Sequence, residues 1–155
     1  VEVLSAGLGD MTLKIEFLPT APMSFLTTHR DGTIRLTDLR LARRTTTAGD
    51  APEQEVVRLP RSAFFSLCFD PLNPEMFAAS CSSHFVRLYD LRMPGRPYDD
   101  GRAESSGCVQ LWTDPTLLRD GKVRPDELRR NSRMHVTDVR FNARGNLLVN
   151  YSGHD

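Results

Sequence analysis

The chain has 155 residues, a length that accommodates one domain or part of one. Its 20 basic and 20 acidic residues cancel, so no overall field favours binding to nucleic acid or to an acidic membrane surface. No apolar run is long enough to span a bilayer, and no signal peptide is evident. Cys68, Cys81 and Cys108 have no paired spacing, which suggests a reducing compartment, and we expect an intracellular location in the nucleus or the cytoplasm.

The first 60 residues predict four short strands. Apolar and polar residues alternate over Thr12–Phe17, which is typical of a half-buried strand. After a break rich in proline, strands are expected at Ser24–Thr28 and Thr33–Thr37, joined by a hairpin turn at Asp31-Gly32. A polar loop then leads to a fourth strand near Val56–Leu59.

The same pattern then begins again, which indicates a second unit and the start of a third. Each unit opens with a strand that ends on phenylalanine, followed by a turn and an apolar strand. The strands expected in the second unit are Phe64–Phe69, Met76–Ser80, Phe85–Tyr89 and Val109–Trp112, and those of the third are His135–Phe141 and Leu147–Tyr151.

An internal repeat supports this division. Residues 24–40 align without gaps on residues 76–92, so that Asp38-Leu39-Arg40 falls on Asp90-Leu91-Arg92. Such a unit cannot bury its apolar face alone and must stack on its neighbours. Four-stranded antiparallel units at this spacing predict an all-β fold that is part of a β-propeller.

The repeat also predicts the domain organisation. We expect residues 1–155 to be an incomplete propeller, a fragment of a longer protein that supplies the remaining blades. The first blade covers 11–59, the second 62–112, and the third starts within 135–155. An insertion at 93–134 overlaps the outer strand of the second blade; it is turn-rich, with a short helix expected near Pro125, and loops of this length are usually functional or disordered.

The strand ends resemble a known family. Phe-x-x-x-x-x-Asp-Gly-Thr-Ile-Arg-Leu-x-Asp at 25–38, with its parallel Val86–Asp90, resembles the WD-repeat family. In that family the third strand closes on Trp-Asp, whereas Thr37 and Tyr89 stand at the Trp position here, and the usual Gly-His opening is missing. The resemblance implies a protein-interaction scaffold built as a propeller.

The ending Asp-Leu-Arg narrows the resemblance. It is similar to the Asp-x-Arg terminus carried by substrate receptors of the cullin-4 RING ubiquitin ligases, and residues 69–78 and 136–152 are similar to the branch of these receptors that includes a WD and tetratricopeptide repeat protein. The resemblance implies docking on the damaged-DNA-binding adaptor of the ligase and a second surface that holds a substrate protein. The partner-binding candidates are Asp38, Leu39, Arg40, Tyr89, Asp90, Leu91 and Arg92.

Each candidate also has a structural interpretation. Arg40 and Arg92 can pair with the aspartates of their own motifs instead of a partner, and Tyr89 replaces a packing residue, which favours the core. Arg35 and Arg87 are expected on blade surfaces, held in ion pairs. A scaffold in another complex, such as a histone-binding or assembly module, and a nucleic-acid binder using arginine-rich loops are the alternatives.

Catalysis and cofactors are not predicted. The sequence contains no Gly-x-Ser-x-Gly elbow, no phosphate-binding glycine loop and no His-Glu-x-x-His stretch. Its four histidines have no shared ligand spacing, so no metal site is expected. His84 and His154 occupy comparable turn positions, for which we expect structural hydrogen bonds. We therefore expect a protein that is not an enzyme and that has no small-molecule substrate.

Overall fold

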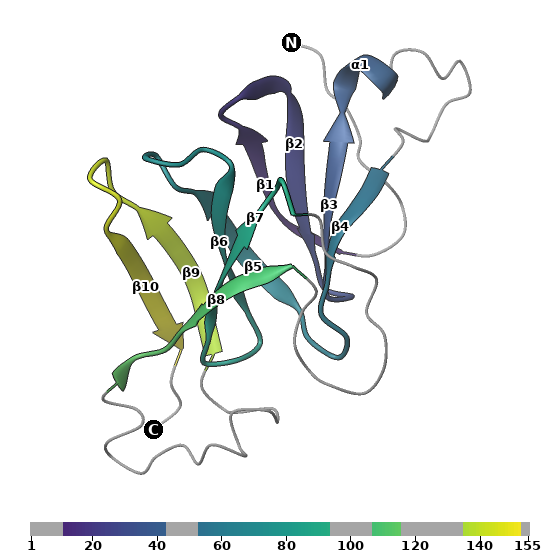
Figure 1. Cartoon of the computed structure of the whole chain (residues 1–155). Helices are drawn as coiled ribbons and strands as arrows, with labels where there is room; N and C mark the ends of the chain where they lie inside the picture. The colour runs from purple at the N-terminus through teal and green to yellow at the C-terminus, as the bar shows by residue number, and fades with distance from the viewer. Residues whose placement is uncertain (1–10, 43–52, 94–106, 116–134, 153–155) are drawn as a thin grey trace.

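The computed structural model describes residues 11–42, 53–93, 107–115 and 135–152, and all but one of the regular elements in these ranges are β-strands (Figure 1). The first sheet has the strand order β1 (Thr12–Leu18), β2 (Ala21–His29), β3 (Thr33–Asp38) and β4 (Glu53–Arg58). The second repeats this order with β5 (Phe64–Phe69), β6 (Met76–Cys81), β7 (Val86–Asp90) and β8 (Cys108–Trp112). A hairpin of β9 (His135–Phe141) and β10 (Leu147–Ser152) follows, and every pairing is antiparallel.

The predicted all-β antiparallel class is confirmed, with small differences at the strand boundaries. Strand β2 begins at Ala21 rather than at Ser24, and Pro22 is tolerated because it precedes the segment that pairs with β3. Strand β4 begins at Glu53, three residues before the expected apolar run, since an edge strand carries charged residues readily. The helix expected near Pro125 and most of the insertion lie outside the described residues.

A single turn of helix, α1 (Leu39–Ala42), follows β3 and was not predicted. The hairpin turn before β3 was predicted: Gly32 has a φ of 81°, a value that glycine adopts without steric strain. In the described residues, no helix is both long and apolar enough to cross a membrane.

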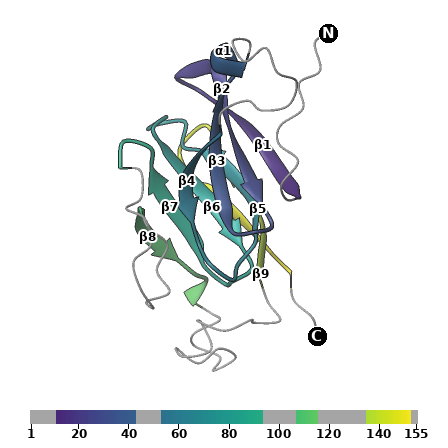
Figure 2. The ribbon, with the colours of Figure 1, turned by 90° about the vertical axis from the view of Figure 1, so that its right-hand side faces the viewer.

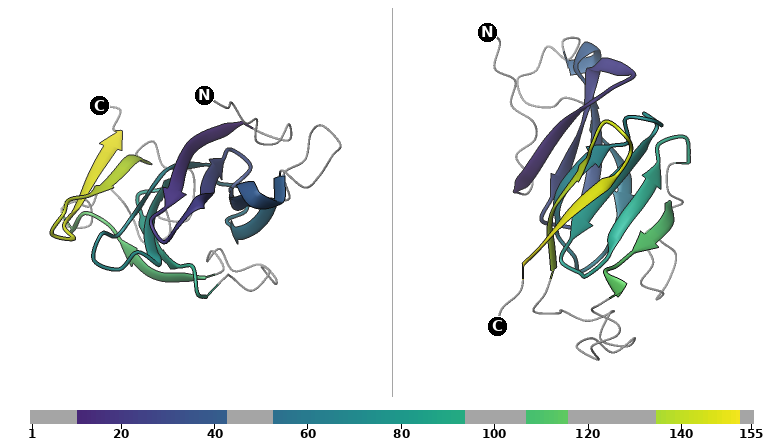
Figure 3. Two further views of the ribbon diagram at one scale, coloured as in Figure 1. Left: turned by 90° about the horizontal axis from the view of Figure 1, so that it is seen from above. Right: turned by 90° about the vertical axis from the view of Figure 1, so that its left-hand side faces the viewer.

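The sheets lie face to face in a row, as the views in Figures 2 and 3 show. The opening strands of the three units are neighbours, with β5 packing against β1 and β9 packing against β5. This stacking follows from the repeat, because each sheet has an apolar face that only a neighbouring sheet can cover.

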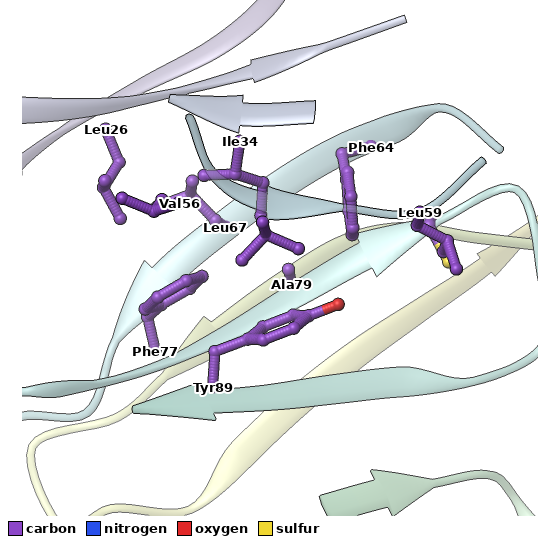
Figure 4. Packing of buried hydrophobic residues seen from close by; sticks show 11 residues of the cluster. Leu26, Ile34, Val56, Leu59, Phe64, Leu67, Phe77, Ala79 and Tyr89 are labelled. Carbon is purple, nitrogen blue, oxygen red and sulfur yellow. The ribbon is translucent and has the colours of Figure 1, made fainter. Parts of the chain in front are cut away.

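Two apolar clusters hold the row together. The larger one lies between the first and second sheets (Figure 4) and includes Leu26, Ile34, Leu67, Phe77 and Tyr89. The smaller one joins the second sheet to the β9–β10 hairpin through Cys68, Ala78, Val86, Val136 and Val139. Alternate residues of β6 therefore contribute to different clusters, because side chains on a strand point to opposite faces in turn.

Candidate protein-interaction site

The two Asp-Leu-Arg motifs occupy equivalent positions in adjacent sheets. Asp38 pairs across the ladder with Ser24 on β2, and Asp90 pairs with Met76 at the matching position of β6. Strands β3 and β7 therefore end at the same side of their sheets, where α1 lies (Figure 1).

In the second sheet the motif folds back on itself. The backbone N–H of Arg92 and its Nε both donate to Asp90 Oδ1 at 2.9 Å, and Nη2 donates to Oδ2 at 2.6 Å. The carboxylate thus receives the guanidinium in the two-point geometry that arginine and aspartate prefer. Asp90 is 9% exposed at its side chain, whereas Arg92 is 64% exposed.

The first sheet repeats this arrangement almost atom for atom. The backbone N–H and Nε of Arg40 donate to Asp38 Oδ1 at 2.9 and 3.0 Å, and Nη2 donates to Oδ2 at 2.6 Å. The Arg40 side chain is 68% exposed. The structural interpretation of these arginines, a pair within the motif, is therefore realised, and the guanidinium still faces solvent in both copies.

These contacts set the charge state of the motif. Hydrogen bonds from Arg92 hold the pKa of Asp90 below its ordinary value, and Arg40 does the same to Asp38. The aspartates in turn raise the pKa of both arginines through the same hydrogen bonds. Each motif therefore presents a charged guanidinium in a fixed orientation, which lowers the conformational entropy lost when a partner binds.

The other candidates are less accessible. Tyr89 is 1% exposed and stacks on Phe77 with ring centroids 5.2 Å apart, in agreement with the core position that the sequence favoured over contact with a partner. Leu91 is partly buried against the larger cluster, and its N–H donates to the Glu75 carbonyl at 2.9 Å. Leu39 is half-buried. The two arginines are the exposed members of the set.

Two residues beside the second motif were missed by the sequence reasoning. Met93 follows Arg92 directly and is strongly exposed, and its N–H donates to the Asp90 carbonyl at 3.0 Å. Glu75 lies in the β5–β6 turn and is close enough to Arg92 to raise its pKa. Adjacency to the motif could have identified Met93, but only the folded chain brings Glu75 to it.

A small hollow lies next to this motif, between the first and second sheets. Val56, Val57, Phe77, Tyr89, Leu91 and Met93 are among its lining residues. Its volume of about 10 Å³ is room for at most one water molecule. Among the described residues, the surface at this motif is therefore an exposed rim, and this hollow is too small for a ligand larger than water.

Arg35 and Arg87 were expected on blade surfaces. Arg35 is half-buried and forms the expected ion pairs, with Asp31 at 2.8 Å and with Glu53 at 3.0 Å. The expected surface position of Arg87 is wrong, because Arg87 is only 7% exposed. Its guanidinium donates hydrogen bonds to the sulfur of Cys81 and to Ser83 Oγ. The guanidinium carbon also lies over the Phe85 ring, 6.0 Å from its centroid.

His29, His84 and His135 make contacts within the fold. His29 Nε2 lies 2.8 Å from Thr27 Oγ1, and the carbonyl of His84 accepts a hydrogen bond from the Tyr151 hydroxyl. The His135 ring packs against Phe65. Within the described ranges no three His, Cys, Asp or Glu side chains converge on a possible metal position. His154 lies outside those ranges.

Comparison with known proteins supports part of the resemblance. No family model matches the chain. The chain is 34% identical over 84 residues to the DDB1- and CUL4-associated factor 6 of Homo sapiens, and equally similar to the protein of that name from Mus musculus. The match covers 54% of this chain but only 10% and 9% of those proteins. The chain thus matches about a tenth of the length of these relatives.

Proposed function

We propose that the chain is part of a WD-repeat β-propeller that serves as a non-catalytic substrate receptor of a cullin-4 ubiquitin ligase. The observation that carries the proposal is the pair of identical Asp-Leu-Arg clamps at one rim of adjacent sheets, together with partial similarity to proteins named for association with DDB1 and CUL4. Such a role would place the protein in the nucleus or the cytoplasm.

The propeller part of the proposal is supported by exposure at equivalent positions. Ile15, Leu67 and Val139 each stand two residues before the phenylalanine that ends the opening strand of a unit. Leu67 and Val139 are 0% and 1% exposed because the preceding sheet covers them, whereas Ile15 is 51% exposed. This apolar position favours a further sheet of the same kind against β1.

The outer face of the β9–β10 hairpin, at the other end of the row of sheets, also favours a further blade. Leu148 on β10 corresponds in the ladder to Ala78 on β6 and Leu26 on β2, which are both fully buried against the following unit. Leu148 itself is 73% exposed. A following blade would cover it, as the propeller requires.

The adaptor part of the proposal depends on Arg40 and Arg92. A guanidinium already oriented by an aspartate can donate from its remaining N–H groups to carbonyls or carboxylates of a partner. Residues in the 93–134 insertion, or the rim at the other end of the strands, would then hold a substrate protein. The chief alternative is a WD-repeat scaffold of another complex, which predicts no adaptor contact at these arginines.

The test is capture of the adaptor DDB1 by the full-length protein in a pulldown. We expect the wild type to capture it and the double variant Arg40→Ala and Arg92→Ala to lose most of that capture. Arg58→Ala is the matched control, because Arg58 is an exposed arginine that pairs with Glu55 away from the motifs. Equal capture by all three folded proteins would remove the proposed interface, and no capture by the wild type would favour the alternative scaffold.

A further inference from the structure

The two repeats differ at one partly buried ion pair, and this difference points to a site of modification. In the first sheet Asp31 accepts the N–H of Thr33 at 2.9 Å and the Nη2 of Arg35 at 2.8 Å. In the second sheet Ser83 occupies the equivalent place: its Oγ accepts the N–H of Phe85 at 3.3 Å and the Nη1 of Arg87 at 2.8 Å. The serine therefore makes two of the contacts of the aspartate, to a backbone N–H and to an arginine, without its charge.

Arg87 lacks the second acid of the first repeat as well. Arg35 also binds Glu53 on the outer strand β4, but the corresponding strand β8 carries no acidic residue in Cys108–Trp112. Over the ranges that the structure describes, the guanidinium of Arg87 donates to Ser83 and to the sulfur of Cys81, and no carboxylate pairs with it. A cation this deeply buried is stabilised by a paired negative charge, which neither partner supplies.

We propose that Ser83 is a phosphorylation site whose phosphoryl group takes the place in the second repeat that the Asp31 carboxylate has in the first. A serine kinase would transfer the terminal phosphoryl group of a nucleoside triphosphate to Ser83 Oγ. The new oxygen–phosphorus bond replaces the bridging bond of the triphosphate, the nucleoside diphosphate leaves, and the hydroxyl proton passes to solvent or a kinase base.

Ser83 is accessible to a kinase, and a phosphoryl group there would add negative charge beside Arg87. Ser83 is partly exposed and lies in the four-residue turn between β6 and β7. A phosphoryl group adds a charge of about −1.5 to −2 and three acceptor oxygens, which an adjacent arginine binds strongly.

The same turn anchors the hairpin that follows. The carbonyl of Ser83 accepts the N–H of Val136 at 3.1 Å, and the carbonyl of His84 accepts the Tyr151 hydroxyl at 3.4 Å. Pairing of the phosphoryl group with Arg87 would fix this turn and so tighten the contact between the second sheet and the β9–β10 hairpin. The turn is at the opposite end of β7 from Arg92, so the effect is separate from the proposed adaptor contact.

The experiment has two parts, both on the full-length protein. The first is mass spectrometry of the protein isolated from its own cells, with a phosphatase-treated sample as control, and we expect phosphate on Ser83. The second installs phosphoserine at position 83 by codon suppression and follows its phosphorus resonance against pH. Next to Arg87 the phosphate should titrate at about pH 5 instead of about pH 6.

Two control proteins test whether Arg87 causes the shift in the titration of phosphoserine 83. In the Arg87→Gln chain the titration of phosphoserine 83 should return to about pH 6. Should that variant fail to fold, phosphoserine at Ser82 is the second control, because Ser82 bonds to Ser62 and not to Arg87. Absence of phosphate on Ser83 in cells, or the same titration for phosphoserine at positions 82 and 83, would overturn the proposal. Capture of DDB1 should be the same with and without phosphate on Ser83, because the adaptor contact is a separate proposal.

Discussion

The ring of Tyr89 stacks on the ring of Phe77 at 5.2 Å between centroids and 22° between planes, directly across the ladder that joins β7 to β6. Phe64 meets the same tyrosine edge-on at 6.3 Å. This aromatic group fills the interface between the first two sheets at the position where the WD-repeat pattern has tryptophan.

Replacing this tyrosine tests the packing. We expect Tyr89→Ala to lower the free energy of unfolding by about 3–5 kcal/mol, because it leaves a cavity among Phe64, Phe77 and Leu67. Urea denaturation measures the change. Leu41→Ala, at an exposed position of α1, should cost less than about 0.5 kcal/mol. Similar losses in both variants would contradict the assignment of Tyr89 to the core.

Alanine should destabilise the fold to different degrees at the two turn glycines, Gly32 and Gly145. A Cβ on Gly32, at a φ of 81°, would lie 2.2 Å from the Leu59 carbonyl oxygen, which is backbone and cannot move aside. A Cβ on Gly145, at a φ of 77°, would instead meet the exposed side chain of Leu72, which can rotate away.

We therefore expect Gly32→Ala to destabilise the fold by about 2 kcal/mol or more and Gly145→Ala by about 1 kcal/mol. Thermal denaturation of both variants gives the order. If Gly145→Ala proved the more damaging, the close approach of the Leu59 carbonyl to Gly32 would be wrong.

His84 makes stability depend on pH. Burial lowers the pKa of its imidazole below 6.5, so the unfolded chain binds more protons than the folded chain once the pH falls below about 6.5. The free energy of unfolding should therefore decrease from about pH 6.5 downward until the folded pKa is passed. Denaturation at a series of pH values measures this slope, and it should be smaller in His84→Gln. An imidazole resonance of His84 that titrates above 6.5 would disprove the mechanism.

The three thiols should differ in reactivity. Burial raises the pKa of the Cys68 thiol to about 11, and Cys81 is fully buried, whereas Cys108 is partly exposed on the edge strand β8. Because the thiolate is the reactive form, a maleimide at neutral pH should label Cys108 first and the other two only as the chain unfolds. Peptide mapping after brief labelling identifies the site. Early modification of Cys68 would contradict its burial.

The strands and their repetition could be predicted from the sequence alone. Alternating apolar residues, the Asp31-Gly32 turn and the gapless match of the two segments act locally, so they predict antiparallel strand pairs before any sheet is assembled. The paired Asp-Leu-Arg ends were visible in the same way. The start of β4 was missed because its charged residues are set by the edge position in the sheet and not by an apolar pattern.

Which side chains face water depends on how the sheets pack. Ile15 and Leu67 look alike in the sequence, but within the described residues the first sheet covers Leu67 and no sheet covers Ile15, so Leu67 is buried and Ile15 is exposed. Arg35 and Arg87 also look equivalent, yet the residues that reach them across the turn and the ladder make one an ion pair and the other a buried cation. The burial of Leu67 and the pairing of Arg35 with Glu53 depend on residues distant in the chain, which a local sequence pattern does not identify.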